Sequence, residues 1–183
     1  MVLTLIYLIS PVQALMVKLD MEELIIGADT IVIGRVEKMR CEWSLDRETI
    51  HTVVTMQIID SLKGNVNDRI LFIQVPGGTI GELSLKVSDM PVFNENEEVL
   101  VFLRSIPNPE KRAHSMSVAQ KTWPSFEVFA QAQGKFSIDS QGMAVRYGYD
   151  LVSQADDHDR ILPMEELKLR IHETLVRIVK ERR

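Results

Sequence analysis

The sequence lacks most of the residues and patterns that mark a disulfide-stabilised protein or a familiar enzyme. Its 183 residues include a single cysteine, Cys41, so no disulfide can form within the chain and stability must come from packing. The patterns G-x-S-x-G, H-E-x-x-H and G-x-x-x-x-G-K-[ST] do not occur. Because these patterns carry the nucleophile, the zinc ligands or the phosphate-binding lysine of large enzyme classes, we expect no activity of those types.

Positive charge is also scarce. The chain has 21 Lys and Arg against 26 Asp and Glu, which gives a formal net charge of −5, and its pI is near 5.4. The basic residues are dispersed, except for a short run at 180–183. A chain of this kind lacks the cationic field that carries non-specific binding to nucleic acid, so we expect no nucleic-acid partner.

The N-terminal apolar run, 2–9, is too short to span a bilayer, because a spanning helix needs about 20 apolar residues. A Ser-Pro pair ends the run, and Val12 and Ala14 supply the modest or small residues of a cleavage site after Ala14. Although no Lys or Arg precedes the run, this layout predicts a secretory signal peptide over 1–14; the alternative is a buried strand. We therefore expect a secreted, periplasmic or cell-envelope protein with no stable membrane span after cleavage.

What the chain does contain is ordinary for a folded domain, with 45% hydrophobic and 26% charged residues. Asp20 and Glu23 have the spacing of a capping box, which predicts a short helix through about 28 with Leu24 and Ile25 facing inward. Near the other end, apolar residues at spacings of three and four predict an amphipathic helix with Pro163 in its first turn. That stripe consists of Met164, Leu167, Ile171, Leu175 and Ile178.

Between the helices, short runs of alternating apolar residues are separated by turn residues, which is typical of β-strands. The predicted strands cover 30–43, 49–61, 69–75, 82–87, 98–103, 126–132, 135–138 and 143–147. Gly34 predicts a bulge in the first strand, and the first two strands form a long hairpin that folds near Asp46. The strand at 98–103 is so hydrophobic that we expect it to be buried on both faces.

Short strands without alternating βα units favour a barrel or sandwich. We predict a mostly β fold, α+β by content, in which a small Greek-key, OB-fold-like barrel carries a short N-terminal helix and a C-terminal amphipathic helix. The barrel domain is expected to cover 15–150. Residues 151–183 are expected to form an acidic linker and the C-terminal helix, which packs on the barrel.

Two stretches of the sequence resemble a known family. Residues 28–36, A-D-T-I-V-I-G-R-V, lead into a Thr-rich strand that ends in Leu62-Lys63-Gly64, and 91–103 has the form P-x-F-x-x-x-E-E-V-L-V-F-L, with an echo at Gly134-Lys135-Phe136. These patterns are similar to netrin-like and tissue-inhibitor-of-metalloproteinase-like OB-fold modules, and the turn at 76–78, P-G-G, resembles that of uncharacterised secreted prokaryotic proteins. The resemblance implies an OB-fold that binds another protein. The zinc-chelating N-terminal cysteine of the inhibitors has no counterpart in this chain.

One pair of residues in the predicted hairpin could carry chemistry. If the hairpin folds near Asp46, Cys41 and His51 could face each other across its strands, and a thiol beside an imidazole can act as nucleophile and base. No third, orienting residue and no oxyanion hole accompany them. The alternative, which we favour, is a buried cysteine beside a surface histidine.

A second group of polar residues could hold a divalent cation. Asp156, Asp157, His158 and Asp159 place four oxygen or nitrogen donors in one predicted loop. Adjacent residues point in divergent directions, however, and no calcium-loop spacing is present, so a solvated acidic linker is the alternative. We assign no metal and no other cofactor.

Aromatic residues are the remaining candidates for a binding surface. Trp43, Trp123 and Phe126 could lie exposed near the barrel loops, and aromatics are enriched at binding hot spots. They could equally be core residues.

The functional expectation is a non-enzymatic, exported module that contacts another extracellular or envelope protein, such as a protease, through barrel loops. The first alternative is a structural or carbohydrate-binding protein of the cell envelope. The second is a hydrolase that uses Cys41 and His51.

Overall fold

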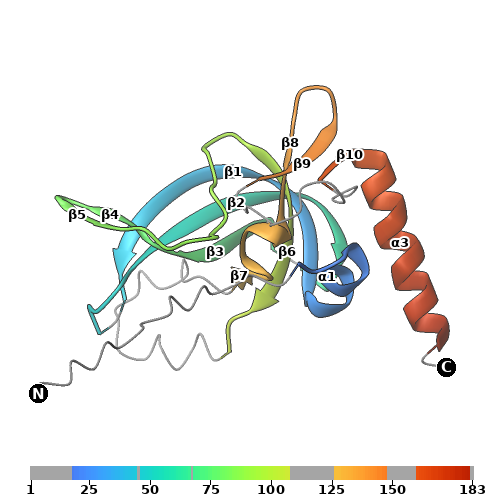
Figure 1. Cartoon of the computed structure of the whole chain (residues 1–183), viewed down its shortest axis with the longest axis horizontal. Coiled ribbons are helices and arrows are strands. Elements are labelled where there is room, and N and C mark those ends of the chain that lie inside the picture. Colours follow the sequence, from blue (N-terminus) through green and yellow to red (C-terminus); the bar gives the residue numbers. More distant parts are fainter. Residues whose placement is uncertain (1–17, 45, 67, 108–125, 148–159, 182–183) are drawn as a thin grey trace, which may run out of the picture.

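The computed structural model describes residues 18–44, 46–66, 68–107, 126–147 and 160–181. The fold is mostly β, with two α-helices among these residues (Figure 1). The elements are α1 (Met21–Gly27), β1 (Thr30–Trp43), β2 (Ile50–Lys63), β3 (Ile70–Pro76), β4 (Gly78–Ile80), β5 (Leu83–Leu85), β6 (Glu98–Ser105), β7 (Phe126–Val128), the 3₁₀ turn η2 (Gln131–Gly134), β8 (Lys135–Ile138), β9 (Met143–Arg146), β10 (Ile161–Pro163) and α3 (Met164–Glu181).

Five strands close into a barrel in the order β1-β2-β3-β7-β6 and back to β1. All neighbours in this ring are antiparallel except β3 and β7, which run parallel and pair only at Ile73–Phe126 and Gln74–Glu127. Strands β8, β9 and β10 extend the same sheet beyond the ring. The predicted fold class is confirmed, and the arrangement is compatible with an OB-fold-like barrel.

The first hairpin folds as predicted. β1 and β2 pair along nearly their whole length, from Ile31–Lys63 to Trp43–Ile50, with a register shift at Gly34. A side chain at Gly34 would place its Cβ 2.6 Å from the backbone oxygen of Gln57, so the bulge needs glycine. In the turn, hydrogen bonds from the Ser44 hydroxyl and a backbone N–H hold the pKa of the Asp46 carboxyl below its usual value.

Two apolar cores fill the molecule. The barrel core consists of Val32, Val36, Val54, Met56, Leu71, Ile73, Val75, Phe93, Val99, Val101 and Leu103. The helix-side core consists of Met21, Leu24, Ile25, Ala28, Ile31, Ile33, Leu100, Phe102, Phe136, Ala144, Leu162, Met164, Leu167 and Ile171. Strand β6 supplies alternate residues to each core, which confirms its predicted burial on both faces.

The two helices cover one end of the barrel (Figure 1). The predicted capping box of α1 is present, because the Asp20 carboxylate accepts the N–H of Glu23 and the Glu23 carboxylate accepts the N–H of Asp20. On α3, the first half of the predicted stripe is buried in the helix-side core, and Leu175 packs against its edge. Neither helix is long and apolar enough to cross a membrane.

The predicted strand at 126–132 is wrong after Val128. Val128 pairs with Leu103 and Lys135 pairs with Val101, so six residues bulge out opposite Phe102 between β7 and β8. The bulge is tight: a Cβ on Gly134 would lie 1.9 Å from the carbonyl oxygen of Phe129. Alternating apolar residues cannot reveal such an insertion, because the break depends on pairing with β6.

Two smaller predictions near the chain's turns are also corrected. The predicted strand 82–87 is the second half of a short hairpin, β4–β5, which turns at Gly81 with a φ of 60° and projects from the barrel (Figure 1). Pro163 ends β10, a strand that we did not predict, and α3 begins one residue later. A three-residue strand is too short to show a period.

Candidate functional site

The structure does not bring Cys41 and His51 together. Cys41 lies opposite Thr52, whereas His51 lies opposite Glu42, so the two side chains point to opposite faces of the hairpin. The expected burial is also reversed, because His51 is only 4% exposed and Cys41 is half-buried. The Sγ of Cys41 accepts the N–H of Thr79 at 3.4 Å and thereby ties the β4–β5 hairpin to β1.

The other predicted candidates do not form one site in the described part of the chain. Trp43 is 37% exposed at the end of β1, whereas Phe126 is half-buried against the barrel core at the start of β7, with β2 and β3 between them. Trp123 lies outside the described residues.

The proposed cation ligands at 156–159 also lie outside the described residues. Within the described ranges, no group of three or more His, Cys, Asp or Glu side chains is placed to hold a metal ion.

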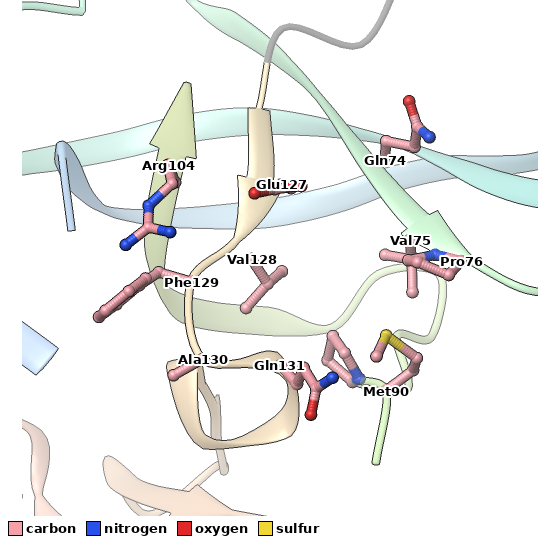
Figure 2. A pocket seen from close by; sticks show the side chains of 11 residues that line it. Gln74, Val75, Pro76, Met90, Arg104, Glu127, Val128, Phe129, Ala130 and Gln131 are labelled. Atoms are coloured by element: carbon pink, nitrogen blue, oxygen red, sulfur yellow. The ribbon is translucent and has the colours of Figure 1, made fainter. Parts of the chain in front are cut away.

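A groove of about 430 Å³ opens where β3 and β7 diverge (Figure 2). After their pairing at Gln74–Glu127, β3 runs on to Pro76 while β7 turns into the bulge, and no backbone bonds join them there. The volume lies in the range of ligand pockets. The groove is lined by Gln74, Val75, Pro76, Met90, Pro91, Arg104, Glu127, Val128, Phe129, Ala130 and Gln131.

One wall of the groove has an unusual backbone. Ala130 and Gln131 both have a positive φ, 58° and 55°, and Asp89, whose carbonyl accepts the N–H of Ala132, has a φ of 59°. Non-glycine residues adopt this region at a cost in free energy, and such residues cluster at functional sites. The hydrogen bond from Ala132 to Asp89 ties this strained turn to the segment that carries Met90.

The groove has a polar end and an apolar end (Figure 2). Gln74, Glu127 and Arg104 lie at the polar end, each from a different strand. The guanidinium of Arg104 lies 4.4 Å from the ring centroid of Phe129, and the Oε1 of Gln74 is buried without a hydrogen-bond partner. The apolar end is formed mainly by Val75, Met90 and Val128.

A buried ion pair lies elsewhere on the barrel. The ammonium of Lys135, 7% exposed, is 2.7 Å from Glu97 and 3.0 Å from the hydroxyl of Ser137, and it lies over the ring of Phe93. Burial lowers the pKa of Lys135 below its usual 10.5, against the opposing effect of Glu97. The cluster joins the turn before β6 to β8, and we assign it a structural role.

Sequence reasoning missed the groove because it joins residues far apart in the chain. Gln74 and Glu127 become neighbours only through the parallel pairing of β3 with β7. One local signal was available: Arg104 follows five consecutive apolar residues, 99–103, so it marks the polar end of a buried strand.

Comparison with known proteins does not assign this chain to a family. No protein-family model matches this sequence, and no curated protein is detectably similar to it.

Proposed function

We propose that this protein is a non-enzymatic binding module, exported to the envelope or the extracellular space, that holds a segment of another protein in the β3–β7 groove. The observation that carries the proposal is the groove itself, which combines an apolar end, a polar end and a strained turn. Loop residues Met90 and Pro91 and the turn at 129–131 form part of its walls, as expected for a barrel that binds through its loops.

The chemistry of the lining supports binding over catalysis. Among the described residues that line the groove there is no Ser, Thr, Cys, His or Lys, so these residues do not supply the common pairs of nucleophile and base. The separation of Cys41 from His51 removes the dyad that the alternative hydrolase would use.

The resemblance to netrin-like and tissue-inhibitor-of-metalloproteinase-like modules supports the same proposal, because those modules bind other proteins. The closed barrel is compatible with their OB-fold. A protease is one class of partner to test, although the inhibitors' cysteine-based zinc chelation cannot apply here.

Site-specific photo-crosslinking tests the proposal. A photoreactive residue at Gln131, which is exposed on the groove wall, should give a discrete protein adduct in envelope or secreted fractions. Glu127→Trp fills the groove from an exposed strand position and should reduce that adduct at least tenfold. Glu37→Trp makes the same change at an exposed position of β1 and should leave the adduct unchanged.

Two results would contradict the proposal. One is equal crosslinking in the Glu127→Trp and Glu37→Trp variants, with both folded by circular dichroism. The other is binding on a glycan array without any protein adduct, which would favour the carbohydrate-binding alternative.

A further inference from the structure

The outer edge of β5 is an open strand edge. Among the described residues β5 pairs with β4 alone, in a two-stranded ribbon that projects from the barrel (Figure 1). The opposite edge of this ribbon is occupied, because the N–H of Thr79 on β4 points to the Sγ of Cys41 on β1. A two-stranded ribbon is only marginally stable by itself, and an open edge is a template for a further strand.

The backbone groups on this open edge belong to Ser84. The ribbon turns through two residues, and the pair that closes such a turn exchanges its backbone hydrogen bonds within the hairpin. The next pair, Thr79 and Ser84, therefore directs its N–H and carbonyl groups outward. Two observations agree: the Thr79 N–H points to β1, and the carbonyl oxygen of Leu85 lies on the β4 side, 2.9 Å from where a Cβ on Gly77 would be.

The sequence around Ser84 is complementary to itself in charge. Residues 82–86 read E-L-S-L-K, and Glu82 and Lys86 are both exposed. An antiparallel copy centred on Ser84 places each Glu82 opposite Lys86 of the second copy, and opposite charges on facing strands stabilise a sheet. Parallel pairing in register would instead place Glu82 beside Glu82. A shift of two residues would remove both ion pairs, so the charges favour one register.

The apolar side chains of β5 follow the same symmetry. Leu83 is 59% exposed and Leu85 is 38% exposed. In the antiparallel pair each Leu83 lies opposite Leu85 of the second copy, at a position without backbone hydrogen bonds, where facing side chains come closest. Because side chains alternate along a strand, the four leucines share one face and the ion pairs lie on the other.

We propose that two copies of this chain associate through β5, whose strands pair antiparallel about Ser84 and form a four-stranded sheet in the order β4-β5-β5-β4. The interface has two-fold symmetry, so each contact away from its centre occurs twice. A three-residue edge buries little area, and association is therefore weak, with a Kd of about 0.1–1 mM. The strand shares no residue with the lining of the β3–β7 groove.

Charge reversal tests the pairing by sedimentation equilibrium of the full chain. Glu82→Lys and Lys86→Glu each place like charges opposite each other and should weaken self-association at least tenfold. An equimolar mixture of the two variants should restore association to the wild-type level, because every lysine then faces a glutamate. Lys38→Glu makes the same change in net charge at an exposed position of β1 and should associate as the wild type does.

A second variant tests the backbone contacts. Ser84→Pro removes the N–H that faces the open edge, and the pairing with β4 does not use that group. Proline is tolerated on the outer side of an edge strand. This variant should lose self-association and keep the circular dichroism spectrum of the wild type.

The mixture decides the register. Restored association in the mixture, with loss in each single reversal and in Ser84→Pro, would support pairing through β5. A wild type that stays monomeric at about 2 mM would overturn the proposal, since that concentration exceeds the expected Kd. Wild-type association of both single reversals, or a mixture that associates no better than either variant alone, would also overturn it.

Discussion

The ammonium group of Lys63 lies 2.6 Å from the carbonyl oxygen of Ala28. The same ammonium donates to the carbonyl oxygens of Ile25 at 2.7 Å and Ile26 at 3.1 Å. Lys63 thus reaches from the end of β2 to cap the C-terminus of α1, where helix carbonyls lack partners. This contact gives a physical reason for the lysine of the Leu62-Lys63-Gly64 pattern.

Removing the Lys63 ammonium should therefore release α1 from the barrel. We expect Lys63→Met to lower the free energy of unfolding by about 1–3 kcal/mol, because carbonyl groups lose charge-assisted hydrogen bonds. Urea unfolding measures the change. Lys86→Met, at an exposed position after β5, should change stability by less than about 0.5 kcal/mol. Equal stability of the two variants would show that the cap contributes nothing.

Alanine substitutions at two glycines should distinguish the cost of a steric clash from the cost of backbone strain. Gly34→Ala would force a Cβ to within 2.6 Å of a backbone oxygen, whereas Gly81→Ala meets no atom within 4 Å and is disfavoured only by its φ of 60°. We expect a loss of more than about 3 kcal/mol for Gly34→Ala and of about 1 kcal/mol for Gly81→Ala. Thermal unfolding compares them, and the reverse order would contradict the bulge.

The buried pair of Lys135 and Glu97 should respond asymmetrically to substitution. Glu97→Ala leaves a buried ammonium without its carboxylate and should cost about 3–5 kcal/mol. Lys135→Met keeps the packing and removes the desolvated charge, so it should cost less. Chemical denaturation of both variants at neutral pH tests this order.

The same lysine gives a prediction for alkaline pH. Because burial lowers the pKa of Lys135 in the folded state, the unfolded chain binds more protons between that pKa and 10.5. The contribution of Lys135 to stability should therefore rise with pH across this window. The stability of wild type relative to Lys135→Met, followed by urea unfolding from neutral to alkaline pH, should increase. A constant difference would contradict the lowered pKa.

The local elements were largely predictable because their causes lie close together in the chain. Asp20 and Glu23 cap α1 within one turn, and the alternation along β1 and β2 is a property of neighbouring residues. The 126–132 segment shows the limit of this reasoning. Its apolar alternation is genuine, yet the bulge after Val128 is set by pairing with β6.

The site could be predicted only in fragments. Cys41 and His51 were rightly placed on facing strands, but the face that each occupies depends on the register across the hairpin, and one residue of register reverses it. The groove residues Gln74, Arg104 and Glu127 come from strands that meet only when the barrel closes.

By itself, the sequence determined the mostly β character, the capped N-terminal helix, the amphipathic C-terminal helix, and the absence of familiar catalytic motifs. These follow from periodicity, caps and composition, which act over a few residues. Only the tertiary structure decided which side chains share a face, where β3 and β7 part, and why Arg104 lies on Phe129. Those relations depend on backbone hydrogen bonds between distant segments, whose register no local pattern encodes.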